Sequence, residues 1–406
     1  MKFAMISPVL PPATSGQAIV LFRLLKNIDP KQFILISPHS FGDINDNKQN
    51  GTSTLGSKYY RVPRFPHLIE IIFLKADRIG FGFFLKIYLM FRTMMFVNIL
   101  RREGCVCVVG CSADLFDPYC SSSACKKLKI PFIFYAFDDY VAQYLNQNDL
   151  YFSQKYGPGI LRSAEKILVP NEFLRDYYYE RYHIDATVIH NPVNLEDYEL
   201  TTPILKGSDK GLSIVYTGAI YAAHYDAFKK LIEAIENLSD LKIVFHIYSD
   251  WEMPEEIDSK KKHTVYHKHQ HNSTMPLIQK EADLLFLPLA FKSPFKDLIV
   301  ETSSPGKMGE YLAAKRPTLV HAPFNSFVAW YFKKYNCGVV AESEDIADLS
   351  EKLRLILTNQ SLRNQLITNA WHRAREDFDE KKVQSQFIKI LQDYISVDTA
   401  DNSALN

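Results

Sequence analysis

The chain has 406 residues, more than one hydrophobic core usually supports, so we expect about two domains. Its composition, 47% hydrophobic and 23% charged, is that of a soluble globular protein. Because 47 basic residues balance 46 acidic ones, the net charge is +1, which excludes the global positive field of many nucleic-acid-binding proteins. We therefore expect no nucleic-acid partner, although a local basic patch is compatible with this balance.

The first half of the chain alternates apolar strands with helical segments, a pattern typical of a parallel sheet with crossover helices. Strands are predicted at residues 2–8, 33–38, 105–111, 131–137, 166–171 and 186–193, and helices at residues 16–28, 118–129 and 172–182.

Five of the six cysteines lie between residues 105 and 125, without the spacing of a zinc site or a disulfide framework. Cys105 and Cys107 alternate along a predicted strand, where free cysteine behaves as a small buried hydrophobe. A reducing, cytoplasmic setting fits this usage. Residues 1–12 also lack the features of a signal peptide.

Residues 68–102 form the most apolar stretch of the sequence. Charged residues, among them Lys75, Asp77, Lys86 and Arg92, interrupt it too often for the roughly 18 uncharged residues of a spanning helix. Two interpretations remain. Core helices are favoured, and the alternative is a partly exposed face that contacts the inner side of a membrane with its basic residues.

A polar segment, residues 196–211, separates the first half from a second α/β series and is predicted to be the linker. The strands of the second series are expected at residues 212–218, 242–249, 263–269, 283–289, 317–322 and 337–342. The domains would then span residues 1–198 and 199–379, with a carboxyl-terminal helix at about 380–396 packing back on the first domain. The predicted fold class is α/β: two doubly wound, Rossmann-like domains that face a cleft, where ligands bind outside the carboxyl ends of the strands.

The segment 301–320, ETSSPGKMGEYLAAKRPTLV, predicts a ligand with two kinds of group. Ser304 is a candidate N-cap and Pro305 suits the first helical turn, whose amides attract anions. Lys307 adds a full positive charge. Glu310, about one turn later, can accept two hydroxyl groups. A ribose carrying a diphosphate offers both, so the segment points to a nucleotide sugar, with an exposed surface helix as the alternative.

This segment resembles the signature of glycosyltransferase family 4, in which a glutamate precedes a small-residue helix, a turn and an apolar strand. Further segments resemble the family in the same order along nearly the whole chain. They are residues 5–25, 188–198, 214–220 and 280–289, and within the segment 301–320 the resemblance covers residues 304–320.

The resemblance implies a GT-B fold, with the donor nucleotide on the carboxyl-terminal domain, the acceptor on the amino-terminal one and neither metal nor cofactor required. Glu310 matches the glutamate that holds the donor ribose. Gly218 matches the glycine at the donor phosphates, and Gly16 matches the glycine of the amino-terminal loop near the transferred sugar. Glycine permits such close approach, although a simple turn also explains Gly16.

The family usually carries another glutamate eight positions before this one, where this chain has Thr302. Glu301 lies one position away. We predict that both residues bind the donor together with Pro305 and Gly306 of the same loop.

The arginine and lysine that brace the diphosphate in the family fall on Ala219 and His224 here. The cations must therefore come from elsewhere. Lys307 is the first candidate, and Lys296 or Lys292 is the second. For the last two, a loop with solvated lysines is the favoured alternative.

Residues 132–144 take the place of a family element in which a histidine often lies near the reaction centre. This chain has Phe137, Asp138 and Asp139 there. Asp138 either contacts acceptor hydroxyls or serves as a base, or it caps the following helix. A catalytic role is favoured because the segment ends a parallel strand.

Four histidines alternate along a predicted strand and loop: His263, His267, His269 and His271. Such spacing places side chains on one face of a strand, but no carboxylate or cysteine completes a zinc site. A solvated strand without metal is therefore expected. The resemblance places this loop near the donor base, so His269 or Gln270 is predicted to contact the base.

The residues and the resemblance together predict a glycosyltransferase of the hexosyltransferase type, and the resemblance implies that it retains the anomeric configuration. It would move a sugar from a nucleoside diphosphate sugar to a hydroxyl of a glycan or lipid-linked acceptor, in bacterial surface polysaccharide synthesis. Two alternatives remain open. One is a nucleotide-sugar epimerase of the same fold, and the other is a non-catalytic protein that binds sugar or nucleotide.

Overall fold

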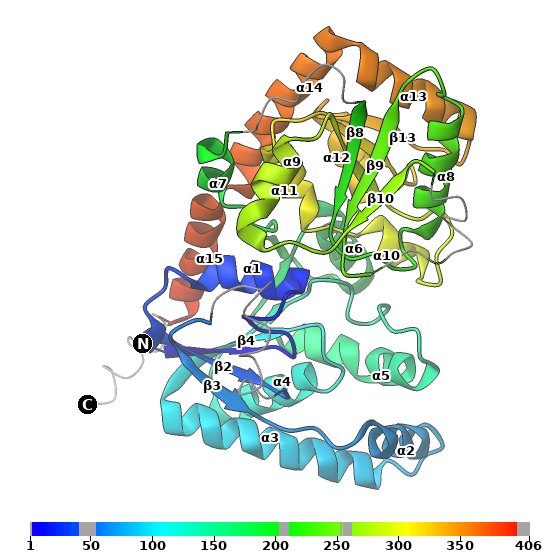
Figure 1. Ribbon diagram of the computed structural model, residues 1–406. Helices are drawn as coiled ribbons and strands as arrows, with labels where there is room; N and C mark the ends of the chain where they lie inside the picture. Colours follow the sequence, from blue (N-terminus) through cyan, green and yellow to red (C-terminus); the bar gives the residue numbers. More distant parts are fainter. Residues whose placement is uncertain (1, 40–53, 203–210, 252–253, 255–261, 396–406) are drawn as a thin grey trace. The chain divides into compact units, whose positions relative to one another are not determined.

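The computed structural model describes residues 2–39, 54–202, 211–251, 254 and 262–395. The chain forms two compact units, one of Met1–His190 with Val383–Asn406 and one of Asn191–Lys382 (Figure 1). The first division therefore falls after His190, earlier than the predicted boundary after residue 198. The predicted linker is partly helical, because Leu195–Leu200 form α7, and its residues 203–210 lie outside the described part of the chain.

The first unit contains a seven-stranded parallel sheet in the order β3-β2-β1-β4-β5-β6-β7. Its strands are β1 (Lys2–Ile6), β2 (Phe33–Ser37), β3 (Lys58–Arg61), β4 (Cys105–Cys111), β5 (Phe132–Tyr135), β6 (Lys166–Val169) and β7 (Thr187–Val188). Because β1 has β2 on one side and β4 on the other, the strand order reverses between β1 and β4. Such a reversal is the usual ligand position in doubly wound sheets.

Helices cover both faces of this sheet (Figure 1). One layer holds α1 (Gly16–Leu25) and α15 (Glu380–Ile395), whose Val383, Phe387 and Leu391 share a core with Leu21 and Leu24 of α1. The other layer holds α2 (His67–Arg78), α3 (Phe83–Glu103), α4 (Asp117–Leu128), α5 (Gln147–Ser163) and α6 (Glu172–Tyr182). All six cysteines are free and buried, as the alternation at Cys105 and Cys107 predicted.

The second unit contains a six-stranded parallel sheet in the order β10-β9-β8-β11-β12-β13, with its reversal between β8 and β11. Its strands are β8 (Leu212–Thr217), β9 (Ile243–Tyr248), β10 (Thr264–His267), β11 (Leu284–Pro288), β12 (Thr318–His321) and β13 (Val339–Ala341). Besides α7, its helices are α8 (Tyr225–Glu236), α9 (Met275–Lys280), α10 (Asp297–Glu301), α11 (Lys307–Ala313), α12 (Phe327–Lys334), α13 (Ile346–Thr358) and α14 (Gln360–Arg373). A π-helical turn, Ala374–Phe378, follows α14.

Helices α2 and α3 correct the prediction of plain core helices at residues 68–102. Their inner sides pack in the core through residues such as Leu74, Leu85 and Leu89, but their outer sides expose large apolar side chains. Among the described helices, α3 is the one long and apolar enough to cross a membrane, and 44% of its apolar window is buried. It begins after two of the charged residues named above as arguments against a span, Lys75 and Asp77, and the buried Arg92 ties it to the unit.

Candidate functional site

Gly218 lies at the strand reversal of the second unit, directly after β8. Its φ of 125° is a conformation that other residues rarely adopt. A Cβ at this position would lie 3.1 Å from Cε and 3.4 Å from Nζ of Lys307. Its own N–H donates to the Tyr248 carbonyl at 2.9 Å, which holds the turn. The absence of a side chain therefore leaves backbone and lysine side by side where a doubly wound sheet binds its ligand.

Lys307 is the first residue of α11, and Gly306 occupies the cap position. Ser304 is therefore not the N-cap, and Pro305 precedes the helix instead of lying in its first turn. Ser304 contributes its carbonyl, which accepts a 2.9 Å hydrogen bond from the Asn191 amide. Because α11 has only seven residues, its dipole is short, and the lysine becomes the main positive group.

The ammonium of Lys307 lies 4.8 Å from the centre of the Tyr216 ring. Burial lowers the pKa of Lys307 to about 8, and the nearby Glu310 carboxylate opposes this effect. A cation over an aromatic face is stabilised by the ring quadrupole. The lysine is thus charged at neutral pH but close to its titration range.

Glu310 lies one turn further along α11 and is half-buried. Its Oε2 accepts a 3.3 Å hydrogen bond from the Gln279 amide, which also donates to Thr217 Oγ1 at 3.1 Å. The buried Tyr311 hydroxyl accepts from the Thr217 backbone N–H at 3.0 Å. This network fixes the carboxylate beside the end of β8, although the residues are far apart in sequence.

The residues at the two family cation positions supply no positive charge. Ala219 has no charged group, and His224 is buried, with its Nδ1 3.4 Å from the Tyr216 hydroxyl. Burial, and then the charge of Lys307, lower the pKa of His224 well below its usual value. His224 is therefore neutral, and within the described part of this cluster the cation is Lys307.

Four other predicted donor residues also belong to the second unit, and two of them are hydrogen-bonded to other residues of it. Glu301 Oε1 accepts from the Asn325 amide at 2.6 Å, and the buried Thr302 hydroxyl donates to the Leu298 carbonyl at 2.7 Å. Lys296 is exposed at the start of α10, and His269 is half-buried in the loop after β10. Their donor-binding roles stay predictions.

Two of the remaining lysine and histidine candidates have other contacts. Lys292 pairs with Glu344 at 3.2 Å. His267 stacks on Tyr248 with ring centres 4.3 Å apart. Within the described residues, no group of three or more His, Cys, Asp or Glu side chains is placed to hold a metal ion.

Gly16 and Asp138 belong to the first unit. Gly16 begins α1 behind the Ser15 cap, and a Cβ there would meet nothing within 4 Å, so the space beside it is open. Asp138 follows β5, and burial raises its pKa to about 6. The local capping role belongs to its neighbour Asp139, which accepts from the Ala142 N–H at 2.7 Å, and α5 is capped by Asn146. A catalytic role for Asp138 stays a prediction.

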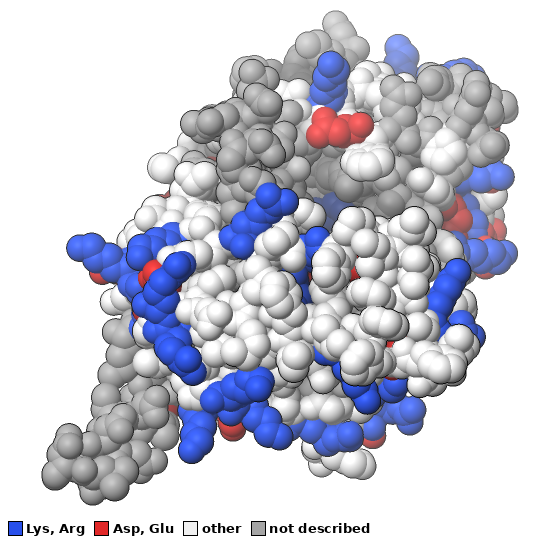
Figure 2. All heavy atoms as spheres, turned by 90° about the horizontal axis from the view of Figure 1, so that it is seen from below, with Lys and Arg blue, Asp and Glu red and all other residues white. Residues whose placement is uncertain are grey.

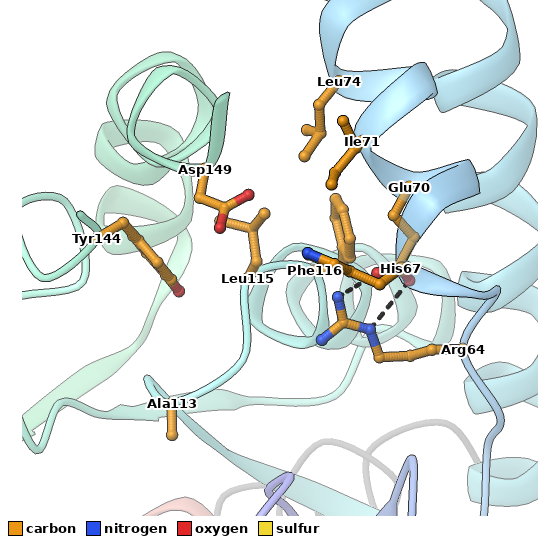
Figure 3. Close-up of a pocket in the computed structure, with 10 residues that line it drawn as sticks. All are labelled: Arg64, His67, Glu70, Ile71, Leu74, Ala113, Leu115, Phe116, Tyr144 and Asp149. Carbon is orange, nitrogen blue, oxygen red and sulfur yellow. Dashed lines mark hydrogen bonds and ion pairs between the residues drawn. The ribbon is translucent and has the colours of Figure 1, made fainter. Parts of the chain in front are cut away.

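The first unit also holds a cavity of about 200 Å³ beyond the carboxyl end of β4 (Figure 3). Figure 3 shows the start of α2 on one side, Tyr144 and Asp149 on the other, and the loop after β4 between them. The lining residues are Arg64, His67, Glu70, Ile71, Leu74, Ala113, Leu115, Phe116, Tyr144 and Asp149. Burial raises the pKa of Asp149. The cavity is smaller than the roughly 300–1,000 Å³ of drug-sized ligand sites, so it suits a small polar group.

Arg64 fixes the shape of this cavity. Its Nε donates to Glu70 at 2.9 Å and its Nη1 to Asp114 at 2.7 Å. Asp114 in turn accepts from the N–H groups of Phe116 and Asp117 at the start of α4. The sequence does not predict this pocket, because Arg64, Asp114 and Asp149 come from three distant segments that no local motif links.

Tyr216 and Gln279 were also not predicted from the sequence. Tyr216 lies two residues before Gly218, inside a segment that resembled the family, and Gln279 directly precedes another such segment. Both positions therefore lay in or beside segments that resemble the family. A tyrosine or a glutamine, however, indicates a binding site only when its contacts are known.

No protein-family model matches the sequence, and no curated protein matches it. Solved structures do match it. A glycosyltransferase from Rickettsia africae aligns at 13% identity and a TM-score of 0.68, over 97% of this chain and 98% of that one. Sucrose-phosphate synthase from Thermosynechococcus elongatus aligns at 12% identity and a TM-score of 0.71, over 98% and 99%.

A third structure, Anabaena HepE in complex with UDP and glucose, aligns at 12% identity and a TM-score of 0.66, over 97% and 99% of the two chains. At these identities the likenesses establish the fold and not the activity. They confirm the prediction from the sequence: the chain has the GT-B fold, built from two Rossmann-like units.

Proposed function

We propose that the chain is a glycosyltransferase of the hexosyltransferase type that moves a sugar from a nucleoside diphosphate sugar to a hydroxyl acceptor. One observation carries the proposal. Gly218, Lys307 and Glu310 lie together at the strand reversal of the second unit, so one site offers a bare backbone, a cation and a carboxylate. The neighbours that are named as a glycosyltransferase, a sugar-phosphate synthase and a complex with UDP and glucose support it.

The cation serves the leaving group. As the anomeric bond breaks toward an oxocarbenium-like state, negative charge grows on the departing diphosphate. Lys307 would stabilise this charge in a half-buried setting, where electrostatic interactions are stronger than in water. Because Gly218 has no side chain, the diphosphate can approach the lysine closely.

The carboxylate serves the ribose. Glu310 is oriented by Gln279, and a carboxylate has about four acceptor positions, so it can keep this contact and accept two ribose hydroxyls. When Glu310 binds the ribose, the diphosphate would lie at the start of the same helix, one turn away.

The acceptor site is proposed at the cavity of the first unit. Asp149, His67 and Tyr144 provide groups that bind sugar hydroxyls, and Arg64 holds the wall in place. By its resemblance to the family, the transfer is proposed to retain the anomeric configuration, with a glycan or lipid-linked acceptor. A role in bacterial surface polysaccharide synthesis stays a prediction.

The test combines donor turnover with a matched pair of variants. The purified full chain is incubated with UDP- and GDP-sugars, release of the nucleotide is followed, and products are analysed by NMR. Glu310→Ala should lower kcat/KM at least roughly 100-fold, because hydrogen bonds to a charged group contribute about 1.5–3 kcal/mol each. Glu351→Ala, an exposed glutamate of α13, should have no effect.

The outcomes separate the alternatives. Transfer to an acceptor with the anomeric centre retained supports the proposal, and near-normal turnover of a folded Glu310→Ala variant contradicts the site. Conversion of the donor to an epimer without an acceptor identifies an epimerase. Binding in calorimetry without turnover of any donor identifies a non-catalytic binding protein.

The acceptor cavity has its own prediction. Asp149→Asn should raise the KM for the acceptor roughly tenfold, since it removes a charged hydrogen-bond acceptor, and should leave hydrolysis of the donor by water unchanged. Initial rates measured against acceptor concentration check this. Equal losses in transfer and in donor hydrolysis would place Asp149 outside an acceptor site.

A further inference from the structure

The outer side of α2, α3 and the turn between them carries an apolar surface. Of the 20 large hydrophobic side chains exposed in the described part of the chain, 12 fall within residues 65–94, so the exposure is concentrated and not scattered. Figure 2 looks on to this face, with uncharged side chains at its centre and Lys and Arg around them. The apolar surface consists of Phe65, Leu68, Ile69, Ile72, Ile79, Phe81, Phe83, Phe84, Ile87, Met90, Phe91 and Met94.

The spacing of these residues shows that α3 is apolar on two sides. Phe83, Ile87, Phe91 and Met94 recur every three or four residues and form one exposed stripe. Other positions of the helix, such as Leu89 and Phe96, are buried in the core. A helix that only packs on a domain needs one apolar side, so the second stripe is unexplained by folding.

The acidic and basic residues of α2 and α3 differ in their exposure to solvent. The carboxylates are buried and paired: Glu70 with Arg64, Asp77 with Lys155 at 2.9 Å, and Glu103 with Lys2 at 2.9 Å. The exposed charged residues are all basic, namely Lys75, Arg78, Lys86, Arg101 and Arg102. The surface therefore presents apolar and positive groups to its surroundings, without an exposed acid on either helix.

This combination favours a lipid surface over a second copy of the chain. Two copies joined through the same face would bring their basic residues together, and like charges oppose such contact. An anionic bilayer instead offers negative headgroups to the basic residues and acyl chains to the apolar ones. The buried ion pair of Arg92 with Asp117 keeps α3 on the domain, which argues for lying on the membrane and against crossing it.

We propose that the apolar surface of α2 and α3 is a docking site for membranes that contain anionic lipids. The apolar side chains insert at the boundary between headgroups and acyl chains, and the five basic residues contact anionic headgroups. This proposal does not depend on the glycosyltransferase activity, because it rests on a different face and a different ligand.

The apolar surface and the cavity of Figure 3 lie on different sides of the same helix, α2. Helix α2 presents Ile71 and Leu74 to the cavity and Leu68 and Ile72 to the apolar surface. A molecule anchored in the bilayer beside Leu68 would therefore lie next to His67, at the edge of the cavity. Docking and the proposed acceptor site thus share one helix, which favours a lipid-linked acceptor.

Flotation with vesicles tests the docking site on the full chain. Vesicles of phosphatidylcholine with phosphatidylglycerol are compared with pure phosphatidylcholine, at low and high salt. The wild-type protein should float with the anionic vesicles, and less so at high salt. The variant Ile72→Gln, Met90→Gln, Phe91→Gln should bind roughly 100-fold more weakly, since burial of three large apolar groups is lost. The variant Lys75→Glu, Lys86→Glu should bind at least roughly 30-fold more weakly, about fivefold for each lysine lost.

Matched controls carry the same changes elsewhere. Tyr179→Gln, Phe324→Gln, Leu355→Gln replaces exposed apolar residues outside the surface, and Lys126→Glu, Lys127→Glu reverses exposed lysines on α4. Both controls should float like the wild type. A wild-type protein that stays soluble with both vesicle types overturns the proposal. So does a wild-type dimer in light scattering that the apolar variant converts to a monomer, since the face would then join two chains.

Discussion

Lys307 combines two features that its sequence neighbourhood does not reveal. Its ammonium lies against the Tyr216 ring, and burial brings its pKa to about 8. Below that pH it is charged and attracts a diphosphate, and above it the charge is lost. The neighbouring His224 cannot compensate, because burial keeps it neutral.

This titration predicts how nucleotide binding depends on pH. The affinity for UDP should begin to fall as the pH approaches about 8 and should fall more steeply above it, by up to about tenfold for each pH unit, as the free protein loses the lysine proton. Up to about pH 9 the phosphate charge of the nucleotide changes little, since the second pKa of a phosphate group is about 6. Calorimetry across the range measures the effect.

Lys307→Arg is the control, because arginine stays charged throughout and should remove the pH dependence while binding persists. A wild-type affinity that does not change above pH 8, or an arginine variant with the wild-type pH profile, would contradict the role of Lys307.

At the scale of the elements, α3 depends on a buried ion pair. Arg92 Nε donates to Asp117 Oδ1 at 2.7 Å, and Arg92 Nη1 donates to the carbonyls of Val62 and Pro63. The arginine thus joins α3 to the start of α4 and to the chain before α2. The outer side of α3 can remain apolar because the inner side is held by this contact and by the core.

Replacing only one partner of this ion pair should destabilise the fold. Arg92→Met leaves the Asp117 carboxylate buried without its partner and should lower the free energy of unfolding by about 3–5 kcal/mol. Urea denaturation followed by circular dichroism measures this. Adding Asp117→Asn should recover part of the loss, because no unpaired charge remains. A single variant that loses less than about 1 kcal/mol would show that the pair is not needed.

At the scale of the whole molecule, each unit has its candidate site beyond the carboxyl ends of its parallel strands. The proposed donor contacts, Gly218, Gln279, Lys307 and Glu310, all belong to the second unit, and the cavity of Figure 3 belongs to the first. Two similar sheets therefore carry two sites with different side chains, one with Lys307 and Glu310 that is proposed for the donor, and one with Asp149, His67 and Tyr144 that is proposed for the acceptor.

Because the proposed donor contacts all lie in the second unit, a bound nucleotide should stabilise that unit. With UDP at about 100 times its Kd, the second unit should gain about 2.7 kcal/mol of stability, because ligand binds only its folded form. Hydrogen exchange read by mass spectrometry should show slower exchange in peptides covering the end of β8, α9 and α11. Protection confined to the first unit would place the nucleotide site elsewhere.

Much of this molecule follows from local sequence. The alternation of apolar strands and helices indicated two doubly wound sheets, because residues near in sequence decide secondary structure and parallel strands need crossover helices. Lys307 and Glu310 became candidates locally, because a lysine at a helix start and a glutamate one turn later suggest a nucleotide sugar, whereas Gly218 became one through the resemblance of its segment to the family. The structure brings the three together, and their donor-binding roles stay predictions. Ser304 was predicted as the cap, but the helix begins later and Gly306 is the cap, a shift of two residues that changes every capping role.

Only the tertiary structure decided the rest. It placed Tyr216 under Lys307 and Gln279 against Glu310, brought Arg64, Asp114 and Asp149 around one cavity, and left one side of α2 and α3 uncovered. These contacts join residues that are tens of positions apart, and periodicity reports how apolar a side of a helix is but not what covers it. Packing between distant segments settles that, and packing is a property of the folded chain.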